Sequence, residues 1–304
     1  RVINTKESGN HVVVVVSAMG DTTDELIEKA KQITLNPSNR ELDMLVSTGE
    51  QISISLLAMA IKSLGHDSIS LTGSQCGILT SSRHKNARIE KIDTERLQNE
   101  LNEGKIVIVA GFQGVNDKGD ITTLGRGGSD TSAVAIASAL KAKKCEIYTD
   151  VDGVYTTDPR IVPNASKIDK ISYDEMLELA SLGAGVLHPR AVELAKKYDL
   201  TIEVKSSLNN NPGTEIVGVN SLEKAIVSGV ALDKDMAKVS VIEVPDKPGI
   251  AFSIFSALSK HSIYFDMIIQ NVTRNSVNDI TFTVKGDELD EALEVTRKVA
   301  EEIG

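Results

Sequence analysis

The chain has few of the residues that a nucleic-acid-binding surface requires. It contains no tryptophan, and aromatic residues make up only 3% of its 304 residues. Acidic side chains outnumber basic ones, 43 to 33, which gives a net charge of -10 at pH 7. Nucleic-acid surfaces depend on clustered cations and on rings that stack with bases. The composition therefore argues against a nucleic-acid partner.

Cysteine and long apolar runs are also scarce. Cys76 and Cys145 are the two cysteines, and their spacing fits neither a CxxC motif nor a metal site. We expect reduced thiols in a cytoplasmic protein. No apolar run reaches the length that spans a membrane, and the start, Arg1–Asn4, does not read as a signal peptide. Because this start lacks an initiator methionine, we expect further residues ahead of it.

What is present is typical of a globular α/β protein. Hydrophobic residues make up 41% and charged residues 25%, and the length suffices for one large or two medium domains. Five consecutive valines, residues 12–16, predict a strand buried on both faces. Further strands at 69–72, 105–115, 146–149 and 201–205 alternate with helices such as 41–64. This order predicts a mostly parallel sheet.

The most informative stretch begins with a glycine loop, residues 125–131, ahead of an apolar helix at 133–142. Its glycines let the backbone approach a ligand, and Ser129 and Asp130 occupy positions expected of a helix N-cap. A helix start suits a phosphate, and Arg126 adds a permanent cation. Asp130 is an acid in an anion site, which a metal or the orientation of a reacting group would explain. The alternative is a turn that only caps a buried helix.

A second loop, residues 150–160, follows the strand at 146–149 and carries three aspartates, a tyrosine and an arginine. A simple turn does not require so many polar groups. The carboxyl ends of parallel strands meet at one edge of a sheet, where ligands collect. Ser17 follows the valine strand, so we expect Ser17 and both loops to form a single site.

The last third of the chain predicts a smaller unit. A strand at 237–244, a helix through Lys260, strands at 263–273 and 279–285, and a helix at 287–303 follow in order. This β-α-β-β-α order is that of a ferredoxin-like unit without its final strand. The loop at 209–214 is of the kind that separates domains, and we expect domains at 1–219 and 220–304. A strand-like segment at 225–232 has no place in the unit.

The motifs Gly125–Asp130 and Thr149–Arg160 closely resemble the signatures of the aspartate kinases, which belong to the amino-acid kinase superfamily. The resemblance extends over essentially the whole chain. Residues 246–251 and 266–271 resemble an ACT domain, an amino-acid-sensing module that these kinases carry in tandem. The resemblance implies a three-layer sandwich followed by the first, apparently incomplete, module. Two departures are the absence of the family's N-terminal Lys-(Phe/Tyr)-Gly-Gly loop and Gly185, where many members carry lysine.

The resemblance also implies an activity and its residues. The family uses ATP and Mg²⁺ to phosphorylate the β-carboxylate of L-aspartate, the first step of lysine, threonine and methionine biosynthesis. Catalysis would fall to Arg126 and Asp130. The substrate residues would be Asp21, Thr22, Thr23, Asp24, Glu25, Thr48, Glu50, Arg126, Gly127, Gly128 and Ser129. The nucleotide residues would be Ser17, Thr149, Asp150, Asp152, Tyr155, Thr156, Thr157, Asp158, Pro159 and Arg160. The effector residues would be Asp246, Gly249, Ile250, Ala251, Gln270 and Asn271.

Several alternatives remain open. Thr22 and Glu25 have the spacing of a capping box, and Glu50 could simply be solvated. Ser172 with Glu175 reads as a capping box without a further role, and His188 as a helix cap or a surface group rather than a ligand. A kinase acting on glutamate or acetylglutamate, or a non-catalytic amino-acid-sensing subunit, would also fit. The expected partners are L-aspartate, ATP, lysine or threonine as effector, and a second copy of the chain in a homodimer or larger oligomer.

Overall fold

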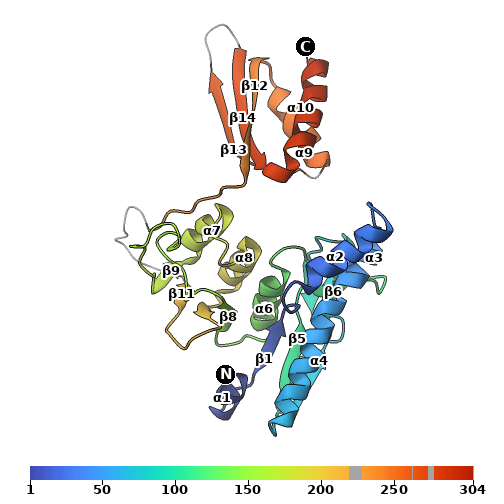
Figure 1. The fold of residues 1–304 in the computed structure, drawn as a ribbon, viewed down its shortest axis with the longest axis vertical. Helices are drawn as coiled ribbons and strands as arrows, with labels where there is room; N and C mark the ends of the chain where they lie inside the picture. The colour runs from blue at the N-terminus through green and yellow to red at the C-terminus, as the bar shows by residue number, and fades with distance from the viewer. Residues whose placement is uncertain (219–227, 262, 273–276, 304) are drawn as a thin grey trace. The chain divides into compact units, whose positions relative to one another are not determined.

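The computed structural model describes residues 1–218, 228–261, 263–272 and 277–303 (Figure 1). The chain divides into two compact units, Arg1–Leu232 and Asp233–Gly304. The domain boundary expected between residues 219 and 220 lies outside the described residues. The strand expected at 225–232 begins outside them too, and its described part, 228–232, forms no strand.

The first unit begins with α1 (Val2–Glu7) and then builds a parallel sheet with helices on both faces. Its strands are β1 (Val13–Val16), β5 (Ile106–Ala110) and β2 (Ser68–Leu71), with β5 in the middle. Alternate residues of β5 point to opposite faces, as a strand requires. Ile106 and Ile108 pack with α4 (Thr48–Ser63), whereas Val107 and Val109 pack with α5 (Glu95–Asn102) and α6 (Gly128–Ala139). The α/β class and the layering of helix, sheet and helix are confirmed.

A second sheet continues the unit in the order β8-β10-β11-β9. Its strands are β8 (Cys145–Thr149), β10 (Ile202–Ser206), β11 (Thr214–Val217) and β9 (Lys170–Ser172), with α7 (Tyr173–Ser181) and α8 (Pro189–Tyr198) packed on it. β8 and β10 run parallel, while β10 and β11 run antiparallel. The loop at 209–213 therefore joins two strands of one sheet, and its predicted role as a domain separator is wrong. The buried Thr214 hydroxyl donates to the Ile168 carbonyl at 2.5 Å, which anchors β11.

A third sheet has the order β4-β3-β6-β7. It contains β4 (Ile89–Ile92), β3 (Ile78–Thr80), β6 (Gln113–Val115) and β7 (Ile121–Thr123). β7 pairs antiparallel with β6, so the two strands form a hairpin. The strand expected at 105–115 is instead two strands, β5 and β6. The chain breaks at Phe112, whose φ of +66° is incompatible with a continuous strand.

The helix predicted at 41–64 is two helices, α3 (Asn39–Val46) and α4, which meet at Ser47. By length and composition the stretch Asn39–Ser63 could cross a membrane, contrary to the expectation that no apolar run is long enough. However, Asp43 and Glu50 are buried within it, and α4 packs on the first sheet. Figure 1 shows α4 alongside β5. One face of α4 is therefore packed on the sheet, while Ile52, Leu56 and Met59 stay exposed.

Two predicted caps have different outcomes. The box at α2 (Thr22–Ile33) does not form, because Asp21 is the N-cap and the Thr22 hydroxyl donates to the Met19 carbonyl. The box at α7 does form: Ser172 accepts from the Glu175 amide, and the Glu175 carboxylate accepts from the Ser172 amide.

The segment before the second unit is attached to the first. The Val230 amide donates to the Thr156 carbonyl at 2.7 Å, and the Ser228 hydroxyl donates to Glu175 Oε1 at 2.7 Å. Ala231 packs against the core beneath the second sheet. Residues 228–231 therefore belong to the first unit and contact the loop after β8.

The second unit has the predicted β-α-β-β-α order. Its elements are β12 (Met236–Pro245), α9 (Ile250–Lys260), β13 (Phe265–Val272), β14 (Val277–Lys285), a short 3-10 turn (Gly286–Glu288) and α10 (Leu289–Ile303). β14 lies between β12 and β13 in an antiparallel sheet, and both helices pack on one face of it (Figure 1). In the core, the Phe255 ring of α9 contacts the Phe282 ring of β14, with ring centroids 5.5 Å apart. The ferredoxin-like prediction is confirmed for this unit.

Candidate functional site

A cavity of about 240 Å³ lies where the ends of β1 and β5 meet the glycine loop. Its lining comes from five separate parts of the chain, which only the fold brings together. The lining residues are Ser17, Ala18, Thr23, Glu50, Phe112, Gly125, Arg126, Gly127, Gly128, Ser129 and Asp130. The predicted meeting of Ser17 with the glycine loop is thus observed.

The glycine loop has a left-handed backbone that only glycine adopts easily. Gly125 has a φ of +78° and Gly127 a φ of +64°. Gly127 is the N-cap of α6, so Ser129 and Asp130 lie in the first helical turn and the prediction that they cap the helix is wrong. Space also excludes a side chain, since a Cβ on Gly127 would lie 2.2 Å from the His188 ring. The Gly128 amide donates to the Gly125 carbonyl, which leaves the Ser129 and Asp130 amides as the N–H groups that the first turn of α6 can offer to a ligand.

Glu50 is the most constrained charge in the cavity. Its side chain is 3% exposed, and Oε1 accepts from the Ala18 amide at 3.1 Å. Oε2 is buried and has no hydrogen-bond partner among the described residues. Desolvation raises the pKa of Glu50, while the backbone N–H groups of Glu50 and Ala18 oppose the rise. The solvated alternative is wrong, and Oε2 is available to a donor from a ligand.

Gly49 explains how Glu50 reaches this position inside a helix. A Cβ on Gly49 would lie 2.8 Å from the Cβ of Ala18. The glycine lets the chain after β1 approach α4 closely enough for the Ala18 amide to bond Glu50. Gly49 is the second residue of α4, so it costs less than the roughly 1 kcal/mol that a glycine costs in a helix interior.

Arg126 and Asp130 are the other charged groups of the lining. Arg126 is exposed, and no carboxylate lies within ion-pair distance of it in the described part of the chain. Asp130 is half-buried, and desolvation raises its pKa, an effect that a hydrogen bond from the His188 backbone partly offsets. The cavity therefore combines a free cation, a buried carboxylate and an acid with a weakened preference for charge.

The other predicted substrate residues stand outside the lining. Of the residues at the start of α2, Thr23 lines the cavity, but Asp21, Thr22, Asp24 and Glu25 do not. The Thr48 hydroxyl donates to the Leu45 carbonyl at 2.7 Å within the helical turn between α3 and α4. Their roles at a substrate stay predictions.

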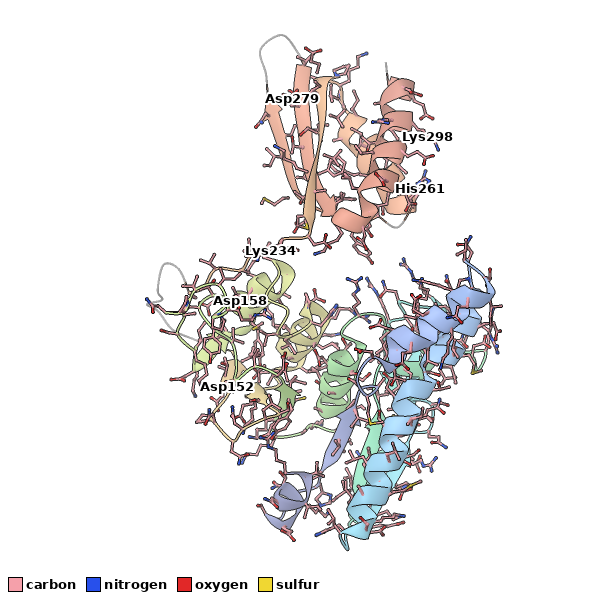
Figure 2. The ribbon with its side chains drawn as sticks, in the orientation of Figure 1. Asp152, Asp158, Lys234, His261, Asp279 and Lys298 are labelled. Atoms are coloured by element: carbon pink, nitrogen blue, oxygen red, sulfur yellow. The ribbon has the colours of Figure 1, made fainter. Side chains whose placement is uncertain are left out.

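The loop after β8 is held by bonds of its own. The Thr149 hydroxyl donates to Asp150 Oδ1 at 3.0 Å, and Asp158 accepts from Arg160 Nε and Nη2. Asp152 and Asp158 both belong to this loop (Figure 2). Asp152 accepts from Asn209 Nδ2 at 2.6 Å, the largest cause of its lowered pKa, which agrees with a supporting position.

None of residues 149–160 lines the cavity, so the structure does not unite this loop with the glycine loop in one described pocket. Asp150, Tyr155, Thr156, Thr157, Pro159 and Arg160 accordingly stay predicted nucleotide residues. Within the described ranges, no group of three or more His, Cys, Asp or Glu side chains could hold a metal ion.

Two residues of the lining, and one contact beside it, were not predicted from the sequence. Ala18 and Phe112 line the cavity, and a Cβ on Gly128 would lie 2.8 Å from the Phe112 ring. The predicted cap at His188 is confirmed, since Nδ1 accepts from the Arg190 amide. The packing of its ring on Gly127 was not foreseen, because nothing in the sequence links positions so far apart.

Comparisons with known proteins find two families in the chain. The model of the amino acid kinase family matches residues 1–206, and that of the ACT domain matches residues 239–301. The chain is 55% identical to an aspartokinase of Bacillus sp. (strain MGA3) over 296 residues, which are 97% of the chain and 72% of that relative.

Two solved structures extend the comparison. An aspartate kinase from Synechocystis matches with a TM-score of 0.65 and 49% identity, over 100% of this chain and 52% of that one. Aspartokinase III of E. coli, in complex with lysine and aspartate, matches with a TM-score of 0.74 and 26% identity, over 99% of this chain and 78% of that one.

Proposed function

Because the chain belongs to the aspartate kinase family, we propose that it transfers the γ-phosphoryl group of ATP to the β-carboxylate of L-aspartate. The products are 4-phospho-L-aspartate and ADP. The reaction is the first step of lysine, threonine and methionine biosynthesis. The first unit would carry the catalysis and the second its feedback control.

The buried Glu50 oxygen, which has no donor among the residues that the structure describes, is the observation that carries the assignment of substrate. An ammonium group would supply the missing donor and neutralise the buried charge. Arg126, on the same lining, would pair with the α-carboxylate through its planar fork. Glu50 and Arg126 thus match the α-ammonium and α-carboxylate groups of an amino acid. The side chain of that amino acid would then point to the start of α6.

The chemistry at that side chain requires alignment more than proton transfer. A β-carboxylate is already ionised at pH 7, so no general base is needed. One of its oxygens forms a bond to the γ-phosphorus while the bond between that phosphorus and the β–γ bridging oxygen breaks. The electron pair leaves with ADP. Free N–H groups of α6 would stabilise the charge on the transferring group, and Asp130 would orient it.

ATP use follows from the family, whereas Mg²⁺ is part of the proposal. Mg²⁺ in such sites binds phosphates and one or two carboxylates and keeps several waters. Asp130 fits that demand at the cavity, and Mg²⁺ would there reduce repulsion between the two anions. Residues 149–160 would hold the nucleotide, with Asp152 bracing the loop through Asn209.

One assay separates the candidates. ADP release would be measured with ATP and, in turn, L-aspartate, L-glutamate and N-acetyl-L-glutamate. Release with aspartate supports the proposal. Release with either glutamate compound would move the chain to a neighbouring kinase, and no release with any acceptor would favour a non-catalytic sensing subunit.

Regulation would reside in the second unit. Gly249, with a φ of +98°, is the N-cap of α9 and leaves the Ile250 and Ala251 amides free for a carboxylate. Asp246 precedes this turn, and Gln270 and Asn271 are exposed on the edge strand β13. We propose lysine or threonine as the effector and a homodimer formed through this unit, since an open strand edge favours pairing. A cytoplasmic location completes the proposal.

Calorimetry with lysine and with threonine, on wild type and Asn271→Ala, tests the effector residues. Binding that the substitution weakens supports them. The assignment fails if wild type binds neither amino acid, or if the variant binds as tightly. Sedimentation of the wild-type protein tests the dimer separately.

A further inference from the structure

The start of α8 touches the glycine loop at three points. Arg190 Nη1 donates to the Leu124 carbonyl at 2.6 Å, immediately before Gly125. The His188 ring packs on Gly127, and the His188 backbone N–H lies close enough to the Asp130 carboxylate to offset part of the rise in its pKa. The loop's entry, middle and exit are therefore all in contact with one helix start.

His188 is fixed in a single form. Its Nδ1 accepts from the Arg190 amide at 3.3 Å, so the proton of the neutral ring sits on Nε2. Burial is the largest cause that lowers the pKa of His188, and the charge of Arg190 adds to it. The lowered pKa favours the neutral ring, which lies against Gly127.

Arg190 joins a second segment to the same place. Its Nη2 donates to the Ala87 carbonyl at 3.0 Å, and the Ala87 amide donates to the Thr123 carbonyl at 2.9 Å. The Lys85 carbonyl lies against Gly125, where a Cβ would be 2.9 Å away. Arg190 therefore links both strands of chain that enclose the loop's first glycine.

We propose that His188 and Arg190 are positioning residues for phosphoryl transfer, which hold Gly127, the α6 amides and Asp130 in register with the substrate. The inference rests on the proposed function. A cap alone needs only a small acceptor such as serine or asparagine. The ring against Gly127, and the two-carbonyl bridge of Arg190, exceed what capping requires. Neither side chain lines the cavity, so neither contacts the reacting atoms.

The test compares His188→Asn and Arg190→Lys with Ser172→Ala. Asparagine keeps the cap acceptor of α8 but removes the ring, and lysine keeps the charge but cannot bridge two carbonyls at fixed geometry. Ser172→Ala removes the cap of α7 in the same unit without touching the loop. The measurements are kcat, the KM for aspartate and for ATP, and Tm.

We expect His188→Asn and Arg190→Lys to lower kcat about tenfold or more, because sub-ångström misplacement of a transferring group is costly. Both KM values should change far less. Ser172→Ala should lower Tm but keep the wild-type kcat. A wild-type kcat in both loop variants, or kcat losses that follow Tm in all three proteins, would show a purely structural role. Absence of aspartate-dependent ADP release from wild type would instead refute the proposed function.

Discussion

At the scale of single residues, the cavity presents charges that the described part of the fold leaves unmatched. Arg126 has no carboxylate within ion-pair distance there, and Glu50 has a buried oxygen without a donor. An unsatisfied buried group costs free energy in the empty protein. A ligand that pairs with these groups removes this cost on binding. Each of these residues should therefore lower the stability of the empty protein and raise its affinity for the ligand.

Glu50→Gln should raise the free energy of unfolding of the empty protein at pH 7 by about 1–3 kcal/mol, the cost of an unsatisfied buried charge. Desolvation raises the pKa of Glu50 from 4.5, so the folded state holds this proton more tightly than the unfolded state. Wild-type stability therefore falls as the pH rises from 4.5 through the folded-state pKa. The variant's advantage should vanish below pH 4.5.

Urea unfolding at pH 4 and pH 7 measures this difference. Glu90→Gln, at an exposed position of β4, is the matched control and should change stability little at either pH. Equal stability of wild type and Glu50→Gln at pH 7 would mean that Glu50 has a donor after all.

Arg126→Ala should raise the KM for aspartate more than tenfold and leave the KM for ATP nearly unchanged. Losing a charge that pairs with a substrate carboxylate typically costs about 2–5 kcal/mol. Steady-state kinetics measures both constants. Arg83→Ala, at an exposed arginine outside the cavity lining, serves as control. An unchanged KM for aspartate would remove Arg126 from the substrate site.

Asp130→Asn should lower kcat far more than it changes either KM. Asparagine still accepts a bond from the His188 amide, so the loop keeps its shape while the negative charge is lost. The measurement is again steady-state kinetics. A large KM effect with kcat preserved would make Asp130 a binding residue.

At the scale of elements, one buried carboxylate ties α3 to the third sheet. Asp43 is fully buried and accepts from His84 Nδ1 at 2.8 Å, from the Lys85 amide, and from both the amide and the hydroxyl of Thr123. Thr123 ends β7, two residues before the glycine loop. The support of the loop therefore begins on a helix about 80 residues earlier in the chain.

Asp43→Asn should destabilise the first unit by about 2–4 kcal/mol. The amide nitrogen of asparagine is a donor and would face N–H and O–H groups that need an acceptor, and the strong hydrogen bonds to a charged carboxylate would be lost. Hydrogen exchange followed by mass spectrometry should show faster exchange in β7 and in residues 84–87. Exchange in β12 and β14 of the second unit provides the internal control. Unchanged exchange in β7 would contradict the role of Asp43.

Elements with strong local signals were predictable from the sequence. The valine run of β1 and the Ser172 box depend on neighbours in sequence, and both form. The prediction that the valine strand is buried on both faces is wrong, because β1 is an edge strand and Val13–Val16 are only partly buried. β3 and β11 were missed because they are short and are held by distant partners, as Thr214 is by Ile168. The same limit applies to the site. Its residue types could be recognised, but the orphaned oxygen of Glu50 depends on where Ala18 lies in the fold.

At the scale of the whole molecule, the two units have separate cores and therefore separate sources of stability. The stretch of chain that joins the two units is one route by which an effector bound to the second unit can act on the first. Residues 228–231 are the described stretch nearest to the second unit that is fixed to the first. Its amide at Val230 binds the loop that we propose for the nucleotide.

Val230→Pro tests this attachment, because proline removes the N–H that bonds Thr156. The Val230 side chain is 62% exposed, so its loss should affect packing little. We expect ATP to slow proteolysis near residues 228–232 in wild type and much less in the variant. Leu232→Pro, at another exposed position, is the control. Equal protection in wild type and Val230→Pro would separate the segment from the nucleotide loop.

The hydrogen bond from the Val230 amide to the Thr156 carbonyl joins residues 228–231 to the loop after β8, so a change in one affects the other. Reciprocity requires that whatever nucleotide does to the order of residues 228–231, a change imposed on those residues does in equal measure to nucleotide affinity. A force that pulls residues 228–231 away from Thr156 should therefore lower the affinity for ATP. If residues 149–160 hold the nucleotide as we propose, this backbone hydrogen bond would couple residues 228–231 to nucleotide affinity without any movement inside the cavity.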